Sequence, residues 1–145
     1  MDINECLEKR FLIKTGSAPD LVQKELAEAA YDLEKSEKAF SDEDWKWAII
    51  KAYYCMFHAA RAVLFKIGLR ETKHFAIGIV LEDLYKKGKI ESNYVNNFNA
   101  ALSSREDADY HYFYSKDIAK HNLEIAEEFL ARMKKLIAKL KGGIK

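Results

Sequence analysis

Hydrophobic and polar positions alternate along residues 20–40 with the period of an α-helix. Apolar side chains recur there at steps of four and three and share one face, while the opposite face is charged. Ser17 precedes this pattern as a typical N-cap, with Pro19 in the first turn. The pattern predicts an amphipathic helix with the following buried face: Val22, Leu26, Ala29, Leu33, Ser36 and Phe40.

The segment over residues 45–67 has a different pattern. A cap signal precedes it at residues 41–44, and Gly68 supplies a left-handed stop after it. Between these signals the apolar residues surround the helix axis instead of forming one stripe. Such a helix must be covered on several sides, so we expect it to be the central helix of the fold or part of an oligomer interface.

Three more helices are expected in the second half of the chain. The first covers residues 73–87 and stops at Gly88, the second begins at Ser92, and the third runs from Ser115 to the glycine pair at 142–143. Because short connections make consecutive helices antiparallel neighbours, these elements predict an up-and-down bundle.

The whole chain is therefore predicted to be all-α. A short helix over Asn4–Ile13 brings the total to five or six helices in an antiparallel bundle. We find no internal repeat and no linker, so residues 1–145 are expected to form a single domain with its core at about 17–141.

Composition and charge narrow the function classes. The 145 residues are 49% hydrophobic and 32% charged, with 24 basic against 23 acidic side chains, so no long-range field favours nucleic acid or anionic lipid. No secretion signal is present, and no apolar run approaches the roughly 20 residues of a membrane span, which predicts a cytoplasmic protein with no membrane contact. Cys55 and His58 lie three residues apart, but no further ligand motif completes a site, so no metal and no cofactor are predicted.

Residues 103–114 concentrate the polar and aromatic chemistry of the chain. At about 100° per residue, Arg105, Asp109 and Tyr112 fall on one side of a helix, whereas His111 is rotated by about 120° from Arg105. A regular helix therefore keeps Arg105 and His111 apart. They converge only if the helix ends near Asp109 or if a second chain contributes one of them across a two-fold axis.

Two interpretations of this segment stay open. In the structural one, Arg105 and Asp109 form an ion pair at a helix end, and the three tyrosines at 110, 112 and 114 are half-buried anchors. In the functional one, Arg105 binds a phosphate, His111 moves a proton between a ribose 2′-hydroxyl and a leaving oxygen, and Asp109, Tyr110 and Tyr112 support them.

A second candidate site lies where the helix over residues 73–87 begins. Lys73 and His74 could hold an anion at the free backbone amides of that helix start. His74 could equally be a capping residue and nothing more.

The sequence Ala52-Tyr53-Tyr54-Cys55-Met56-Phe57-His58-Ala59-Ala60-Arg61-Ala62 closely resembles the signature of HEPN-domain proteins of the UPF0332 type. The later elements Lys73-His74 and Arg105-x-x-Ala108-Asp109-Tyr110 occur in the same order as in that family. The resemblance implies an antiparallel bundle with a four-helix core, usually a homodimer, often encoded in prokaryotes beside a minimal nucleotidyltransferase.

The resemblance also implies an activity. Many HEPN proteins are metal-independent endoribonucleases that act as toxins. They use an arginine and a histidine that are separated by four to six residues and lie near the dimer interface, and Arg105 and His111 with five residues between them match that spacing. We therefore expect the helical member of a toxin–antitoxin-like pair with a nucleotidyltransferase. The alternatives are a non-catalytic module that binds a nucleotide or a partner through Arg105, Lys73 and His74, and a purely structural oligomer.

Overall fold

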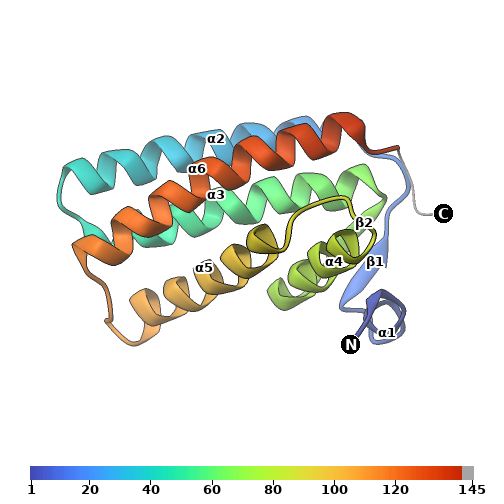
Figure 1. The fold of residues 1–145 in the computed structure, drawn as a ribbon, viewed down its shortest axis with the longest axis horizontal. Helices are drawn as coiled ribbons and strands as arrows, with labels where there is room; N and C mark the ends of the chain where they lie inside the picture. The colour runs from blue at the N-terminus through green and yellow to red at the C-terminus, as the bar shows by residue number, and fades with distance from the viewer. Residues whose placement is uncertain (142–145) are drawn as a thin grey trace.

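The computed structural model describes residues 1–141, and helices dominate it (Figure 1). The all-α prediction is confirmed, and six helices lie within the described residues, together with one two-stranded sheet. In chain order the elements are α1 (Ile3–Glu8), β1 (Leu12–Lys14), α2 (Pro19–Ser41), α3 (Trp45–Lys66), β2 (Leu69–Glu71), α4 (His74–Lys86), α5 (Ser92–Tyr110) and α6 (Lys116–Lys139).

Four long helices form the bundle, and α3 is its central element (Figure 1). Helix α3 packs against α2, α4, α5 and α6, which explains why its apolar residues surround the axis. By length and composition α3 alone among the described helices could span a membrane, but 78% of its most apolar stretch is buried by the neighbouring helices. The sequence pattern is thus the pattern of a core helix.

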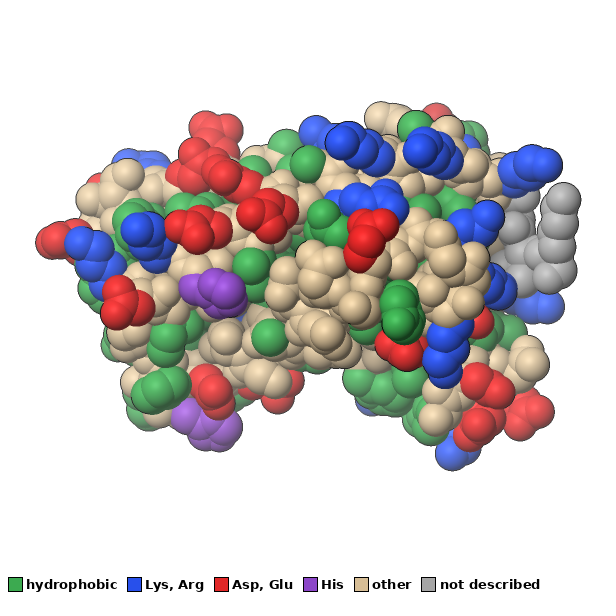
Figure 2. Space-filling model, viewed as in Figure 1, with side chains coloured by type: hydrophobic (Ala, Val, Ile, Leu, Met, Phe, Trp, Pro, Cys, Tyr) green, Lys and Arg blue, Asp and Glu red, His purple; other side chains and the backbone are tan. Residues whose placement is uncertain are grey.

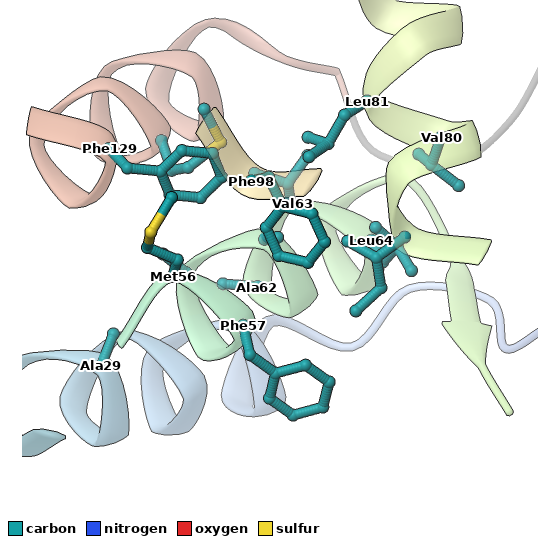
Figure 3. Packing of buried hydrophobic residues seen from close by; sticks show 14 of the residues in the cluster. Ala29, Met56, Phe57, Ala62, Val63, Leu64, Val80, Leu81, Phe98 and Phe129 are labelled. Atoms are coloured by element: carbon teal, nitrogen blue, oxygen red, sulfur yellow. The ribbon is translucent and has the colours of Figure 1, made fainter. Parts of the chain in front are cut away.

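Aromatic and sulfur-containing side chains fill the centre of the bundle (Figure 3). Phe98 from α5 and Phe129 from α6 are fully buried and stack with ring centres 5.9 Å apart. Met56 from α3 lies beside them in the same view. This layer ties α3, α5 and α6 together and places Tyr53, whose ring centre is 5.9 Å from that of Phe98, next to the same core.

Most helix boundaries follow local signals. Gly68 and Gly88 adopt the predicted left-handed conformation with φ of 82° and 72°, and the Ser115 hydroxyl accepts the amide of Ile118 at 3.2 Å, as an N-cap does. The predicted Ser17 cap is wrong: Ala18 occupies the N-cap position of α2, with no side-chain hydrogen bond. The glycine pair predicted to end the last helix lies outside the described residues.

The N-terminal segment differs from the prediction of a helix over Asn4–Ile13. Helix α1 ends at Glu8, Arg10 turns the chain with φ of 60°, and β1 then pairs antiparallel with β2. The strand forms because Leu12 is buried and because the backbone of β1 finds its partners in β2, from Leu12↔Glu71 to Lys14↔Leu69. Local periodicity does not report such a tertiary contact.

Charged side chains form local groups on the surface. On the face in Figure 2, acidic side chains gather over the half that holds the turn from α2 to α3 and again around α1, and basic side chains gather over the upper part of the half near the C-terminus. The balanced net charge therefore conceals local patches. Anion binding at any one place must depend on individual cations and not on the field of the whole protein.

Candidate functional site

Arg105 lies on α5 and points toward α3. Its Nη2 donates a hydrogen bond of 3.0 Å to the hydroxyl of Tyr54, and its guanidinium carbon lies 5.6–5.8 Å from the ring centres of Tyr53, Tyr54 and Tyr110. Cations are attracted to such ring faces. Aromatic rings, not a carboxylate, therefore hold this guanidinium in place.

Most of the hydrogen-bonding capacity of Arg105 remains unused. The Nε atom is buried with no hydrogen-bond partner, and within residues 1–141 Arg105 forms no ion pair. The Arg105–Asp109 pair of the structural interpretation is thus absent there. A guanidinium has five N–H donors and a permanent charge, and phosphate is one of the anions that such a fork binds bidentately.

His74, the first residue of α4, lies on the same aromatic cluster. Its ring stacks on Phe57 with centres 4.5 Å apart, and its Nδ1 is 2.7 Å from the Tyr53 hydroxyl. Burial, with Arg105 as the next largest cause, lowers the pKa of His74, and burial raises the pKa of Tyr53 far above its ordinary value. The imidazole is therefore neutral at pH 7, Tyr53 donates to Nδ1, and Nε2 carries the ring proton.

The structure thus brings two of the sequence-predicted residues together. Arg105 and His74 both contact Tyr53, although they are on different helices, and each offers at least one N–H donor. Lys73 is exposed and occupies the N-cap position of α4 without a side-chain capping bond. Its backbone therefore adjoins His74, and no contact joins its amine to the aromatic cluster within residues 1–141.

His111 lies on another face of α5. Its amide still donates to the carbonyl of Asp107 as in a helix, its Nδ1 is 3.2 Å from Asp107 Oδ1, and its side chain is 69% exposed. Asp107 is two positions after Arg105, about 200° around the helix. Within one chain, the side chains of Arg105 and His111 therefore point in different directions.

The chain turns only after His111. Helix α5 ends at Tyr110, and Tyr112 adopts the left-handed region with φ of 55°, which is uncommon for a residue with a large side chain. The tyrosines here are not the half-buried anchors of the structural interpretation, because all three are exposed: 64% at Tyr110, 78% at Tyr112 and 43% at Tyr114. Asp109 is half-buried beside them.

Sequence reasoning missed the two tyrosines that organise the cluster. Tyr53 and Tyr54 belong to the long motif on α3, and a central apolar helix made them look like ordinary core residues. The signal that could have distinguished them is the rarity of two phenolic hydroxyls in a fully covered helix, because a buried hydroxyl needs a polar partner. Those partners are His74 and Arg105.

A second polar group on α3, Arg61, lies about two turns after Tyr54. Arg61 Nε donates to Glu71 Oε1 at 3.1 Å, and its Nη1 is 3.6 Å from Glu25 Oε1 on α2. The Glu71 side chain is only 5% exposed. Arg61 therefore neutralises a buried carboxylate of β2 and links α2, α3 and the small sheet.

Comparisons with known proteins agree with this architecture. A 127-residue alignment, 28% identical, covers 83% of this chain and 86% of a protein of Methanocaldococcus jannaschii that carries the name "Putative toxin MJ0142". The HEPN domain matches residues 22–137, which include all four long helices of the bundle apart from their outermost turns. A match over most of the chain, on helices that pack as one bundle, shows that this protein belongs to the HEPN domain family.

Proposed function

We propose that this HEPN protein is a toxin-like protein whose site binds a phosphate group at Arg105. The observation that supports this most directly is how the guanidinium is held: three aromatic rings surround it, and its Nε has no hydrogen-bond partner. Within residues 1–141 no carboxylate balances the charge of this guanidinium, and a bound phosphate supplies that counter-charge. The name of the M. jannaschii relative supports the toxin-like part of the proposal.

The proposed reaction is metal-independent cleavage of RNA by two protomers. Arg105 of one chain binds the scissile phosphate, and His111 comes from a second chain in a homodimer. The imidazole takes the proton of the ribose 2′-hydroxyl as that oxygen attacks phosphorus, and the proton passes to the departing 5′ oxygen, which leaves a cyclic phosphate. The exposure of His111 supports a partner chain as the place where its ring acts, because within its own chain it does not face Arg105.

RNA cleavage in the presence of EDTA tests this reaction. We expect the parent protein to cut single-stranded RNA, and Arg105→Ala or His111→Ala to slow the cutting by at least about 100-fold, the usual effect of losing an acid–base or electrostatic group. His121→Ala, which alters an exposed histidine of α6, is the matched control and keeps the parental rate.

Mixing the two inactive variants distinguishes a site shared between two chains from a site within one chain. A mixture of Arg105→Ala and His111→Ala chains regains part of the activity if each intact site needs one residue from each chain. Absence of cleavage by the parent protein, or unchanged cleavage by both variants, contradicts the ribonuclease proposal. Co-expression and co-purification with a minimal nucleotidyltransferase test the proposed toxin–antitoxin-like pair.

A second function, nucleotide binding without catalysis, is favoured by the contact of both Arg105 and His74 with Tyr53. We expect ATP to bind more tightly at pH 5.5 than at pH 7.5. Because the pKa of His74 is below its ordinary value, its ring is neutral at pH 7.5 in the free protein. A bound phosphate favours the protonated ring, so lowering the pH and binding ATP favour each other. His74→Gln removes this increase while leaving the ionisation of ATP itself unchanged.

Calorimetric titration with ATP at the two pH values measures the effect. Arg105→Ala is expected to abolish binding at both values, since it removes the permanent charge of the site. If ATP does not bind saturably, or if His74→Gln keeps the full pH dependence, this second function is wrong.

A further inference from the structure

A cluster of potential metal ligands lies between α2 and α3, away from Arg105. Glu28 and Asp32 are one turn apart on α2, and His58 of α3 faces them; one ligand atom from each lies within 4.8 Å of the other two. The three residues offer one imidazole nitrogen and two carboxylates. First-row transition metals, zinc among them, bind this mixture of donors.

A further carboxylate orients the histidine ring. His58 Nδ1 is 2.6 Å from Glu25 Oε2, one turn before Glu28 on the same face of α2. A carboxylate that accepts the Nδ1 proton leaves the lone pair on Nε2, which is the arrangement found behind most histidine ligands of metals. The ring is therefore held with its free nitrogen toward Asp32 and Glu28.

The separation between His58 and Asp32 fits a shared ion better than a direct hydrogen bond. His58 Nε2 lies 3.5 Å from Asp32 Oδ2, beyond the usual range of hydrogen bonds that involve nitrogen and oxygen. Two donors that each lie about 2.0–2.1 Å from a tetrahedral zinc ion are about 3.4 Å apart. Lys51 approaches the other oxygen of Asp32, Oδ1, at 3.9 Å and leaves Oδ2 for the ion.

The charges of the surrounding network also favour a divalent cation. Four carboxylates, those of Glu25, Glu28, Asp32 and Glu71, face two permanent cations, Lys51 and Arg61. These side chains carry two more negative than positive charges, and a divalent ion balances that excess.

We infer that Glu28, Asp32 and His58 form a binding site for a divalent transition-metal ion such as Zn²⁺, with Glu25 orienting the histidine. The ion joins α2 to α3 near the middle of both helices, so it stabilises the bundle as well as binding to it. Cys55 is not a ligand, because its sulfur points to the carbonyl of Ala126 on α6 and burial raises the pKa of Cys55 to about 12.

Calorimetric titration of the full chain with ZnCl₂, after treatment with a chelator and dialysis, tests the site. We expect one ion to bind per chain and to raise the melting temperature. His58→Ala weakens binding by at least about tenfold, because even loss of a group behind a metal ligand has that effect. Glu25→Gln, which alters the orienting group, weakens binding by about tenfold to 100-fold.

Two exposed glutamates of α2 provide a matched comparison that does not depend on a buried residue. Glu28→Gln removes a proposed ligand, and Glu34→Gln changes the same type of side chain two turns further along the helix surface. Only Glu28→Gln is expected to weaken zinc binding. Equal binding by the parent and Glu28→Gln chains, or no saturable binding by the parent, overturns the inference even if His58→Ala does not fold.

Discussion

Arg61→Ala is expected to lower the free energy of unfolding by about 3–5 kcal/mol, the usual cost of removing one partner of a buried ion pair. The reason is the carboxylate that the substitution leaves behind. Glu71 is almost fully covered, and Arg61 Nε at 3.1 Å is its charged partner. Without the guanidinium, Glu71 must stay buried without its counter-charge, take up a proton, or pull β2 away from the bundle.

Urea unfolding of three variants measures this effect and its cause. The double variant Arg61→Ala with Glu71→Gln should recover a large part of the lost stability, because the buried charge is then gone. Lys38→Ala is the control: its partner Asp42 is 62% exposed, so solvent already screens that pair and the loss stays below about 1 kcal/mol. A comparable small loss for Arg61→Ala would show that Glu71 is not dependent on it.

Local signals are the part of this fold that the sequence predicts well. Left-handed glycines, helical periodicity and most cap residues act within a few residues, and they located α2 to α6 apart from the Ser17 cap of α2. The same reasoning failed for β1 and β2. Each strand has three residues, too few for a period to be visible, and each exists because the other supplies its backbone partners.

The sequence identified several residues of the candidate site but not which of them are neighbours in space. The sequence grouped Arg105 with Lys73 and His74 as one possible binding module, but only the packing of α4 and α5 on α3 shows that Arg105 and His74 share Tyr53. Helical geometry did indicate that Arg105 and His111 diverge, and the single chain has that divergence. Only a second chain could bring Arg105 and His111 together, and the local sequence pattern does not show how two chains pack.

His58 illustrates the limit of motif reasoning from a single helix. Its neighbour at three residues, Cys55, suggested a metal pair on one face, yet Cys55 points to α6 and His58 points to α2. The ligands that face His58 lie 26 and 30 positions earlier in the chain. Their one-turn spacing on α2 is visible in the sequence, but such acidic pairs are common on the exposed surfaces of helices.

Phe129→Ala is expected to lower the free energy of unfolding by about 3–5 kcal/mol, as large-to-small changes in a dense core do. Phe129 is fully buried on α6, and its ring stacks on Phe98, which in turn lies 5.9 Å from Tyr53 between ring centres. The substitution therefore opens a cavity where α3, α5 and α6 meet (Figure 3). It also removes the ring that packs against Phe98, and Phe98 in turn packs against Tyr53 of the candidate site.

Chemical denaturation measures the stability lost to the cavity, and ligand titration measures whether the cavity also weakens anion binding at Arg105. Phe129→Leu fills part of the space and should lose clearly less stability than Phe129→Ala. If Phe98 relaxes toward the cavity, Tyr53 moves with it, and Phe129→Ala then weakens anion binding at Arg105 although no atom of residue 129 touches the ligand. Loss of stability with unchanged binding would instead show that Tyr53 is held in place by α3 and His74 alone.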